Sequence, residues 1–88
     1  MIWQVEFDDR ALKELRKLDK PIQSQILRFL RLRIATDENP RRIGSPLKGD
    51  LHGLWRYRVE PYRLVCRIEE KQRIVLILGV GHRKEIYQ

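Results

Sequence analysis

The stretch Leu54–Ile68, LWRYRVEPYRLVCRI, decides the fold because it predicts two neighbouring strands. Apolar and arginine residues alternate along residues 54–59 and 62–69, and Glu60-Pro61 between them predicts a turn. Since successive side chains of a strand point to opposite faces, each strand has one apolar face and one basic face. The basic positions are Arg56, Arg58, Arg63 and Arg67.

Further elements surround these two strands. Residues 2–7 alternate like a short strand, and residues 73–80, RIVLILGV, are continuously aliphatic, as is typical of a central strand. Apolar residues recur at three- and four-residue steps over 11–18 and again over 21–34, which predicts a helical hairpin with a basic outer face. A loop of roughly a dozen residues, rich in proline and glycine, begins at Asn39 and is long enough to be a functional segment.

The order of these elements predicts the fold class. We expect one α+β domain over residues 1–88, with an N-terminal strand, a two-helix hairpin and a three-stranded antiparallel meander. The helices would pack on one face of a twisted, largely antiparallel sheet. The strand arginines would then gather on the opposite, open face.

Composition excludes several classes of protein. Cys66 is the only cysteine, so an internal disulfide is excluded, and with only His52 and His82 beside it the chain cannot build a cysteine zinc site. Cys66 is expected to point inward as a small apolar side chain. No apolar run approaches the roughly 20 residues that cross a bilayer. We expect a soluble, cytoplasmic protein that binds no metal, cofactor or membrane.

Charge is distributed unevenly along the chain. The net charge is +7, and residues 1–40 hold eight Lys and Arg against seven Asp and Glu, whereas residues 41–88 hold eleven against five. An excess of cations favours polyanionic partners such as nucleic acids. A solvated basic surface accounts for the same excess equally well, so charge alone does not decide between them.

The choice of arginine favours an anion site over a merely wet sheet face. Lysine or threonine would keep the face solvated, whereas the planar guanidinium matches two phosphate oxygens. Like charges across strands also destabilise a sheet unless anions or acids pair with them. The groove expected to hold a phosphate backbone combines the strand arginines with Lys48, Arg83 and Lys84.

Two further residues lie near the end of the chain. Guanidinium groups nearby would favour the ionised form of Tyr87, which could then assist proton transfer. Alternatively, the Tyr87 ring packs on the edge of the domain. His82 is the only imidazole near this rim, and a lone histidine is more often structural than catalytic.

Four segments together resemble the RelE branch of the RelE/ParE toxin superfamily, the toxins of type II toxin–antitoxin pairs. They are FDDRALKELRKLDK (7–20), PLKGDLHGLWRYRV (46–59), PYRLVCRIEE (61–70) and ILGVGHRKEIY (77–87). The resemblance implies a RelE-like fold and a ribosome-dependent, metal-independent messenger RNA endonuclease. Such toxins cut the codon in the ribosomal A site through attack by the 2′-hydroxyl.

The resemblance also implies which residues form the site. The two strand lysines of the family fall on Arg56 and Arg58, the arginine of its YRL motif on Arg63, the arginine after VG on Arg83, and its tyrosine on Tyr87. Two features depart from the family. Both lysines are arginines here, which removes any easily deprotonated amine, and the turn between the strands is shorter.

A mechanism follows from this assignment. The arginine side chain stays protonated in proteins and therefore cannot accept a proton. Tyr87 is accordingly assigned as the base that accepts the 2′-hydroxyl proton. Arg56, Arg58 and Arg63 hold the phosphate, and Arg83 stabilises the transition state or the leaving oxygen. His82 ranks second to Arg83 as the acid. Supporting RNA contacts are expected from Lys48, Arg67, Lys84 and His82.

The resemblance further implies partners, and it leaves two alternatives. A monomeric toxin would assemble into a hetero-oligomer with an acidic, RelB-like antitoxin, and would act on the ribosome at the A site, with its 16S RNA and messenger. The first alternative is a ParE-like inhibitor of DNA gyrase that acts by protein contact. The second is a non-catalytic RNA-binding module in which Tyr87 stacks on a base.

Overall fold

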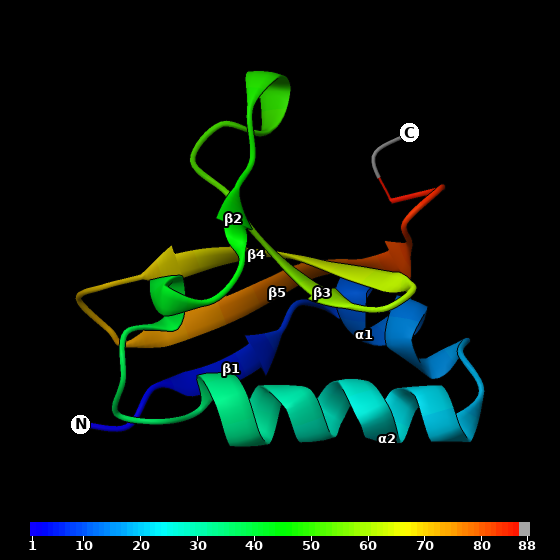
Figure 1. Cartoon of the computed structure of the whole chain (residues 1–88), viewed down its shortest axis with the longest axis horizontal. Helices are drawn as coiled ribbons and strands as arrows, with labels where there is room; N and C mark the ends of the chain where they lie inside the picture. The colour runs from blue at the N-terminus through cyan, green and yellow to red at the C-terminus, as the bar shows by residue number, and fades with distance from the viewer. Residues whose placement is uncertain (87–88) are drawn as a thin grey trace.

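The computed structural model describes residues 1–86, and its elements follow the predicted order (Figure 1). Two helices follow the first strand, and the meander ends the described chain. No helix of residues 1–86 is long and apolar enough to span a membrane. The elements are β1 (Gln4–Phe7), α1 (Asp9–Arg16), α2 (Lys20–Phe29), β2 (Ser45–Pro46), β3 (Trp55–Val59), β4 (Tyr62–Glu69) and β5 (Ile74–His82).

The strands form one mixed sheet in the order β1-β5-β4-β3-β2. Strands β3, β4 and β5 form the predicted antiparallel meander, and β1 joins β5 in parallel, from Gln4 opposite Ile74 to Phe7 opposite Ile77. The predicted α+β class is confirmed. The middle strand is β4 rather than β5, because the short strand β2 adds a fifth member beyond β3.

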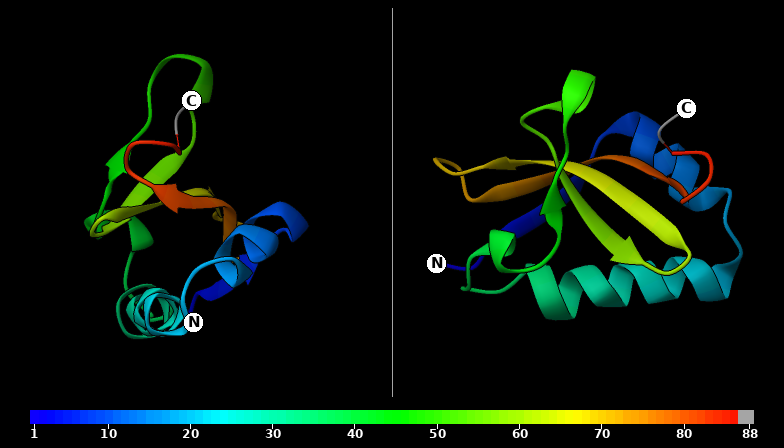
Figure 2. Two further views of the ribbon diagram at one scale, coloured as in Figure 1. Left: turned by 90° about the vertical axis from the view of Figure 1, so that its right-hand side faces the viewer. Right: turned by 45° about the horizontal axis from the view of Figure 1, so that its top comes forward.

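The two helices lie on one side of the sheet (Figures 1 and 2). Asp8 caps α1 by accepting a hydrogen bond from the Ala11 N–H at 2.8 Å. Helix α1 then runs beside the part of β5 that extends past β1, where the Glu14 carboxylate accepts a hydrogen bond from the Val80 N–H at 2.9 Å. A side chain therefore satisfies an edge donor that has no strand beside it.

Helix α2 covers the apolar face of the meander. Ile26 and, in the π-helical turn that follows, Leu30 and Ile34 are buried on one stripe. Phe29 packs against the Tyr57 ring with centroids 5.8 Å apart. The Tyr57 hydroxyl is buried and donates a hydrogen bond to the Pro40 carbonyl at 2.7 Å. The face of β3 that carries Tyr57 therefore packs in the hydrophobic core.

A β-bulge sets which residues of β5 reach each face. Val65 of β4 is opposite Gly79, but the next residue, Cys66, is opposite Ile77, so Leu78 is an extra residue in β5. As a result Val80 returns to the core, where it is 3% exposed. The two glycines that flank Val80 lie toward the open face.

The predicted long loop contains more structure than expected. Gly44 has φ +87°, and a Cβ there would lie 2.3 Å from the Arg56 carbonyl oxygen, so only glycine fits beside β3. The following residues form β2, which pairs with β3. Residues 47–54, which include a 3-10 turn, rise from the sheet on the side away from α2 (Figure 1). We call residues 47–54 the projecting loop.

Candidate active site

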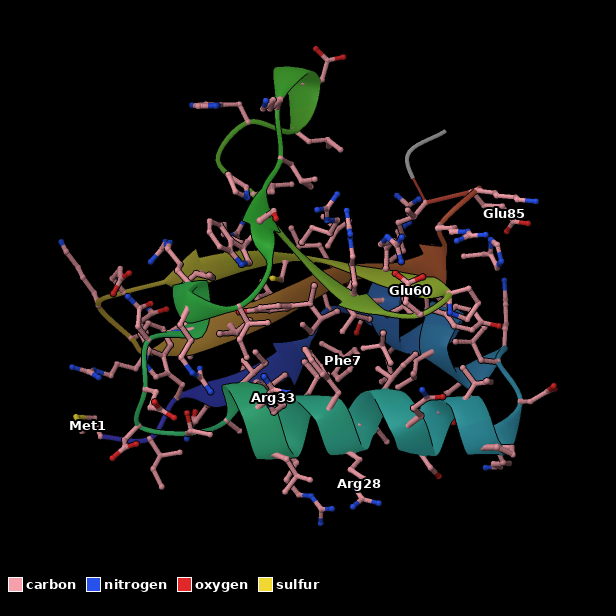
Figure 3. The ribbon with its side chains drawn as sticks, in the orientation of Figure 1. Met1, Phe7, Arg28, Arg33, Glu60 and Glu85 are labelled. Carbon is pink, nitrogen blue, oxygen red and sulfur yellow. The ribbon has the colours of Figure 1, made fainter. Side chains whose placement is uncertain are left out.

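The open face of the sheet carries the predicted arginines. Tyr57 and Leu64 are fully buried on the helix side, so Arg58 and Arg63, which oppose one another in β3 and β4, point to the other side. Arg56 is on the same face, opposite Val65. Figure 3 shows nitrogen-tipped side chains standing above the sheet, between the projecting loop and the turn at residues 83–86, which we call the C-terminal turn. The structure thus brings these three arginines together.

Glu60 links two of the site arginines. Arg63 is only 8% exposed, and its Nη1 forms an ion pair with Glu60 Oε1 at 3.0 Å and donates a hydrogen bond to the Tyr62 carbonyl at 3.0 Å. The other Glu60 oxygen lies 3.9 Å from Arg83 Nη1. A buried charge requires such partners. Glu60 therefore fixes the direction of Arg63 and holds Arg83 at the same end of the sheet.

Arg56 and Arg58 differ from Arg63 and Arg83 in their partners. Within residues 1–86 no acidic side chain pairs with either of them. The Nε of Arg56 is buried and has no hydrogen-bond partner among these residues. A buried donor without a partner costs about 1–3 kcal/mol. Arg56 as a whole is partly exposed and Arg58 is exposed, so this part of the face can offer guanidinium groups to an anion.

The remaining cations lie farther from this cluster. Arg67 is four residues beyond Arg63 on β4, or about 13 Å at the usual rise of a strand. Its Nε donates to Glu69 Oε1 at 3.0 Å. Lys48 is exposed on the projecting loop, and Lys84 is exposed in the turn after β5. These three residues border the open face instead of joining the central arginines.

His82 lies on the other face from the arginines. It is opposite Tyr62, whose ring packs against the core, and the two rings meet edge to face with centroids 5.9 Å apart. Its Nδ1 accepts a hydrogen bond from the Lys84 N–H at 3.2 Å. The structure therefore separates His82 from Arg63 by the thickness of the sheet.

Tyr87, the residue assigned as the base, lies outside the described residues 1–86. Tyr57 is not a substitute, because burial raises the pKa of its phenol above the ordinary value and its hydroxyl already bonds Pro40. Across residues 1–86, no group of three or more His, Cys, Asp or Glu side chains is placed to hold a metal ion.

A cleft of about 940 Å³ extends over β5 beside the arginine cluster. Leu51 and Leu54 of the projecting loop form one wall, and Val65 and Leu78 contribute apolar floor. Ile86 of the C-terminal turn also lines the cleft. Since Val65 is directly opposite Arg56, this apolar surface adjoins the three arginines of the open face.

Cys66 is buried in the core, as predicted. It is fully inaccessible, its Sγ lies 3.5 Å from the Trp55 carbonyl oxygen, and burial raises the pKa of the thiol to about 12. The thiolate is the nucleophilic form of cysteine. Cys66 therefore has no part in the chemistry of the site.

The raised pKa of Cys66 predicts a loss of stability in alkaline solution. Above pH 9.0 the unfolded thiol ionises while the folded thiol stays protonated to about pH 12, so the free energy of unfolding falls as pH rises through this window. The slope approaches roughly 1.4 kcal/mol per pH unit. Urea unfolding at several pH values measures it, and Cys66→Ala should flatten the fall between about pH 9 and 10. An equally steep fall in that variant would contradict the assignment.

Comparison with known proteins agrees with this geometry. Residues 5–87 match the family described as "ParE toxin of type II toxin-antitoxin system, parDE". The chain belongs to this toxin family. Toxin RelG of Mycobacterium tuberculosis is 34% identical over 88 residues, which cover 100% of this chain and 99% of that protein. The mRNA interferase toxin RelE of Escherichia coli is 33% identical over 91 residues, which cover 99% of this chain and 92% of that protein.

Solved structures show the same fold. The toxin–antitoxin complex RelBE2 of M. tuberculosis contains a chain that matches with a TM-score of 0.85 and 32% identity, over 97% of this chain and 95% of that one. The isolated E. coli RelE toxin matches with a TM-score of 0.70 and 27% identity, over 97% and 90%. This type II toxin is therefore a member of the RelE group, as its sequence motifs predicted.

The importance of Glu60 for the site was not predicted. The sequence placed Glu60 in the turn near the strand ends, but it did not show which arginines it would reach. A carboxylate three residues before Arg63, at the point where two arginine-bearing strands meet, was the available signal. The pairing with Arg83 depends on β5 ending beside that turn, where the Arg83 N–H donates to the Pro61 carbonyl at 3.0 Å.

Proposed function

We propose that this RelE-group toxin is a ribosome-dependent endonuclease that cleaves messenger RNA in the A site and so inhibits translation. The observation that carries the proposal is the arginine cluster of the open face, in which Arg56 and Arg58 have no acidic partner within residues 1–86. Guanidinium groups bind phosphate oxygens through paired hydrogen bonds. The names of the relatives, mRNA interferase toxins among them, support the same activity.

The reaction needs no atom from a cofactor. The 2′-hydroxyl oxygen of the messenger attacks the adjacent phosphorus, the bond from phosphorus to the 5′-oxygen breaks, and a 2′,3′-cyclic phosphate and a 5′-hydroxyl result. Tyr87, as phenolate, accepts the 2′-hydroxyl proton. Arg56, Arg58 and Arg63 neutralise the charge that develops on the phosphoryl oxygens, and Arg83 stabilises the leaving oxygen until it is protonated. We propose that the cleavage is metal-independent.

The ribosome supplies what these side chains lack. A phenol is a poor base near neutral pH, and a positioned base contributes only about 10²- to 10⁴-fold in rate. Holding the 2′-oxygen in line with the scissile bond contributes through orientation. Messenger in the A site would be held in a defined conformation, so we propose that free RNA is cleaved far more slowly.

A ParE-like action on DNA gyrase is the second candidate, because the matched family is described as ParE toxins. The relatives above 30% identity favour the nuclease, since they carry RelE or RelG names. An inhibitor that acts by protein contact also has no need for three arginines converging on one sheet face. Gyrase inhibition is therefore kept as an outcome of the test below.

We further propose that an antitoxin of the RelB type binds this chain in the cytoplasm. Solved complexes of similar toxins, from M. tuberculosis and from the archaeon Pyrococcus horikoshii, contain such a partner. The net charge of +7 favours an acidic segment in the antitoxin. We propose a monomeric toxin that forms a hetero-oligomer with its antitoxin.

Primer extension on programmed ribosomes tests the nuclease proposal. Purified toxin is added to ribosomes that hold a defined messenger, and cuts within the A-site codon are expected with ribosomes and not with the messenger alone. Arg83→Ala is expected to lower the cleavage rate by roughly tenfold or more, because it removes a charge that stabilises the leaving oxygen. Intact messenger together with inhibited gyrase supercoiling would assign the chain to the second candidate.

A further inference from the structure

Glu60 is an acidic side chain at the end of the sheet where β3 turns into β4, beside the arginines of the open face (Figure 3). A carboxylate near a phosphate site repels the phosphate, because like charges repel. Glu60 therefore weakens the attraction of this face for RNA. Any benefit that it brings to the site has to come through the arginines that it contacts.

The contact between Glu60 and Arg63 leaves one edge of the guanidinium group unused. Nη1 of Arg63 meets both Glu60 Oε1 and the Tyr62 carbonyl, each at 3.0 Å. Within residues 1–86 no hydrogen bond engages the Nε or Nη2 atom of Arg63. These two atoms form the side edge of the guanidinium group, and such paired donors match two oxygens of a phosphate. Glu60 thus holds Arg63 at one nitrogen and leaves its paired donors for an anion.

Neighbouring charge would displace Arg63 if Glu60 were absent. Arg58 lies directly opposite Arg63 in the register of β3 and β4. Like charges in directly opposite positions repel one another. Glu60 is the only acidic side chain of residues 1–86 that pairs with Arg63, whose side chain is just 10% exposed. The ion pair therefore opposes the repulsion from Arg58 and keeps Arg63 in one orientation.

The second carboxylate oxygen brings Arg83 to the same place. Glu60 Oε2 lies 3.9 Å from Arg83 Nη1. The backbone of Arg83 is attached to the same turn, since its N–H donates to the Pro61 carbonyl at 3.0 Å. A single carboxylate thus reaches two guanidinium groups, one from β4 and one from the end of β5. Both groups are therefore also within reach of a single phosphate, which is no smaller than a carboxylate and binds guanidinium in the same way.

We propose that Glu60 is a positioning residue for cleavage, whose carboxylate holds Arg63 and Arg83 together so that both meet one phosphate of the messenger. This inference rests on the proposed nuclease function. The two arginines touch the reacting phosphate, whereas Glu60 acts only through them. Removal of its negative charge should therefore change the two kinetic constants in different ways.

Glu60→Gln is the central variant, because it keeps the size of the side chain and removes its charge. Cleavage at several concentrations of programmed ribosomes gives kcat and KM. Since a displacement of about 1 Å can cost on the order of 10²-fold, kcat is expected to fall by roughly 10- to 100-fold. KM should stay the same or fall, because a charge that repels the phosphate has been removed. A residue that merely helped to bind RNA would change KM in the opposite direction.

Glu69→Gln is the matched control. Glu69 pairs with Arg67 Nε at 3.0 Å near the other end of β4, so the variant removes the same charge from a similar ion pair. It leaves the contacts of Arg63 and Arg83 intact. Its kcat is expected to stay within about twofold of wild type, as is usual when an exposed ion pair is lost.

A double-mutant cycle tests whether Glu60 acts through Arg83. In the Arg83→Ala background one of the two partners of Glu60 is missing. Glu60→Gln should then lower kcat by a factor at least about threefold smaller than it does in the wild type, because residues that act together are not additive. Equal factors in the two backgrounds would mean that Glu60 and Arg83 act independently, which overturns the proposal.

Nuclear magnetic resonance gives a structural readout that does not depend on activity. The Nη protons of Arg63 should give separate signals in the wild type, since the ion pair restricts rotation of the guanidinium group, and these signals should average in Glu60→Gln. Thermal unfolding by circular dichroism identifies a variant that fails to fold. In that case Glu60→Asp, which keeps the charge on a shorter side chain, decides by the same signals and by kcat, and averaged signals with a lower kcat are expected.

The outcomes separate this inference from the proposed function. An active wild type whose kcat is unchanged in Glu60→Gln overturns the positioning role alone. A higher kcat does so as well, since the carboxylate would then compete with the phosphate, and a higher KM at constant kcat would make Glu60 a binding residue instead. A wild type that does not cleave messenger on ribosomes overturns the nuclease function, and the positioning role with it.

Discussion

Replacement of Tyr87 by phenylalanine is expected to lower the rate of messenger cleavage on ribosomes by about 10²- to 10⁴-fold, the usual contribution of a positioned base. The substitution keeps the aromatic ring and removes only the hydroxyl. The phenol is the best candidate base, because arginine does not deprotonate and Tyr57 is buried with its hydroxyl bonded to Pro40. Single-turnover cleavage across a range of pH measures the effect, and the rate of the wild type should rise with pH.

The same variant separates catalysis from stacking. If Tyr87 only stacked on a base, Tyr87→Phe would keep both ribosome binding and cleavage, since stacking needs the ring and not the hydroxyl. Ribosome binding measured by sedimentation should therefore be unchanged while cleavage falls. Cleavage at the wild-type rate would remove Tyr87 from the mechanism and leave another group to accept the proton.

Arg58→Ala is expected to lower the cleavage rate by about 10²- to 10³-fold, the usual effect of removing a charged donor from a transition state. Arg58 lies directly opposite Arg63 on the open face and has no acidic partner in residues 1–86, so its loss removes the proposed phosphate contact without leaving an acid unpaired. Primer extension with timed samples gives the rate, and the KM for ribosomes should change far less than kcat.

Arg67→Ala provides the matched control for this prediction. It removes the same charge from the same sheet face. Arg67, however, lies about 13 Å along the strand from Arg63, and its guanidinium is paired with Glu69. Its cleavage rate is expected to stay within about threefold of wild type. Arg58→Lys should recover much of the activity, since a point charge remains. Equal losses for Arg58→Ala and Arg67→Ala would show that net charge and not placement matters.

Local pattern was sufficient to predict the meander. The alternation over 54–59 and 62–69 predicted strands that end where β3 and β4 end. An antiparallel strand with one buried and one solvated face alternates apolar and polar residues, so its sequence shows where it runs. The pairing of β1 with β5 was not predictable in this way, since parallel pairing over nearly the whole chain leaves no periodic signal. Strand β2 was missed for another reason: two residues are too few to alternate.

The part of the site that was predictable is the part that depends on the alternation of side chains along a strand. The common face of Arg56, Arg58 and Arg63 follows from the two-residue period of a strand. The same rule, with the register known, puts His82 on the other face beside Tyr62. The register itself depends on the extra residue Leu78, and no local pattern in RIVLILGV marks that bulge. The position of Gly81 opposite Arg63 therefore needed the structure.

The parallel pairing of β1 with β5 has a consequence for synthesis of the toxin. Residues 4–7 are synthesised well before their partners, residues 74–77. Until then the sheet lacks an inner strand and β1 has no neighbour. Contacts between distant parts of a chain also slow folding. A chain that stops before β5 lacks the strand that joins β1 to β4, so we expect the folded toxin to form only after β5 has been synthesised.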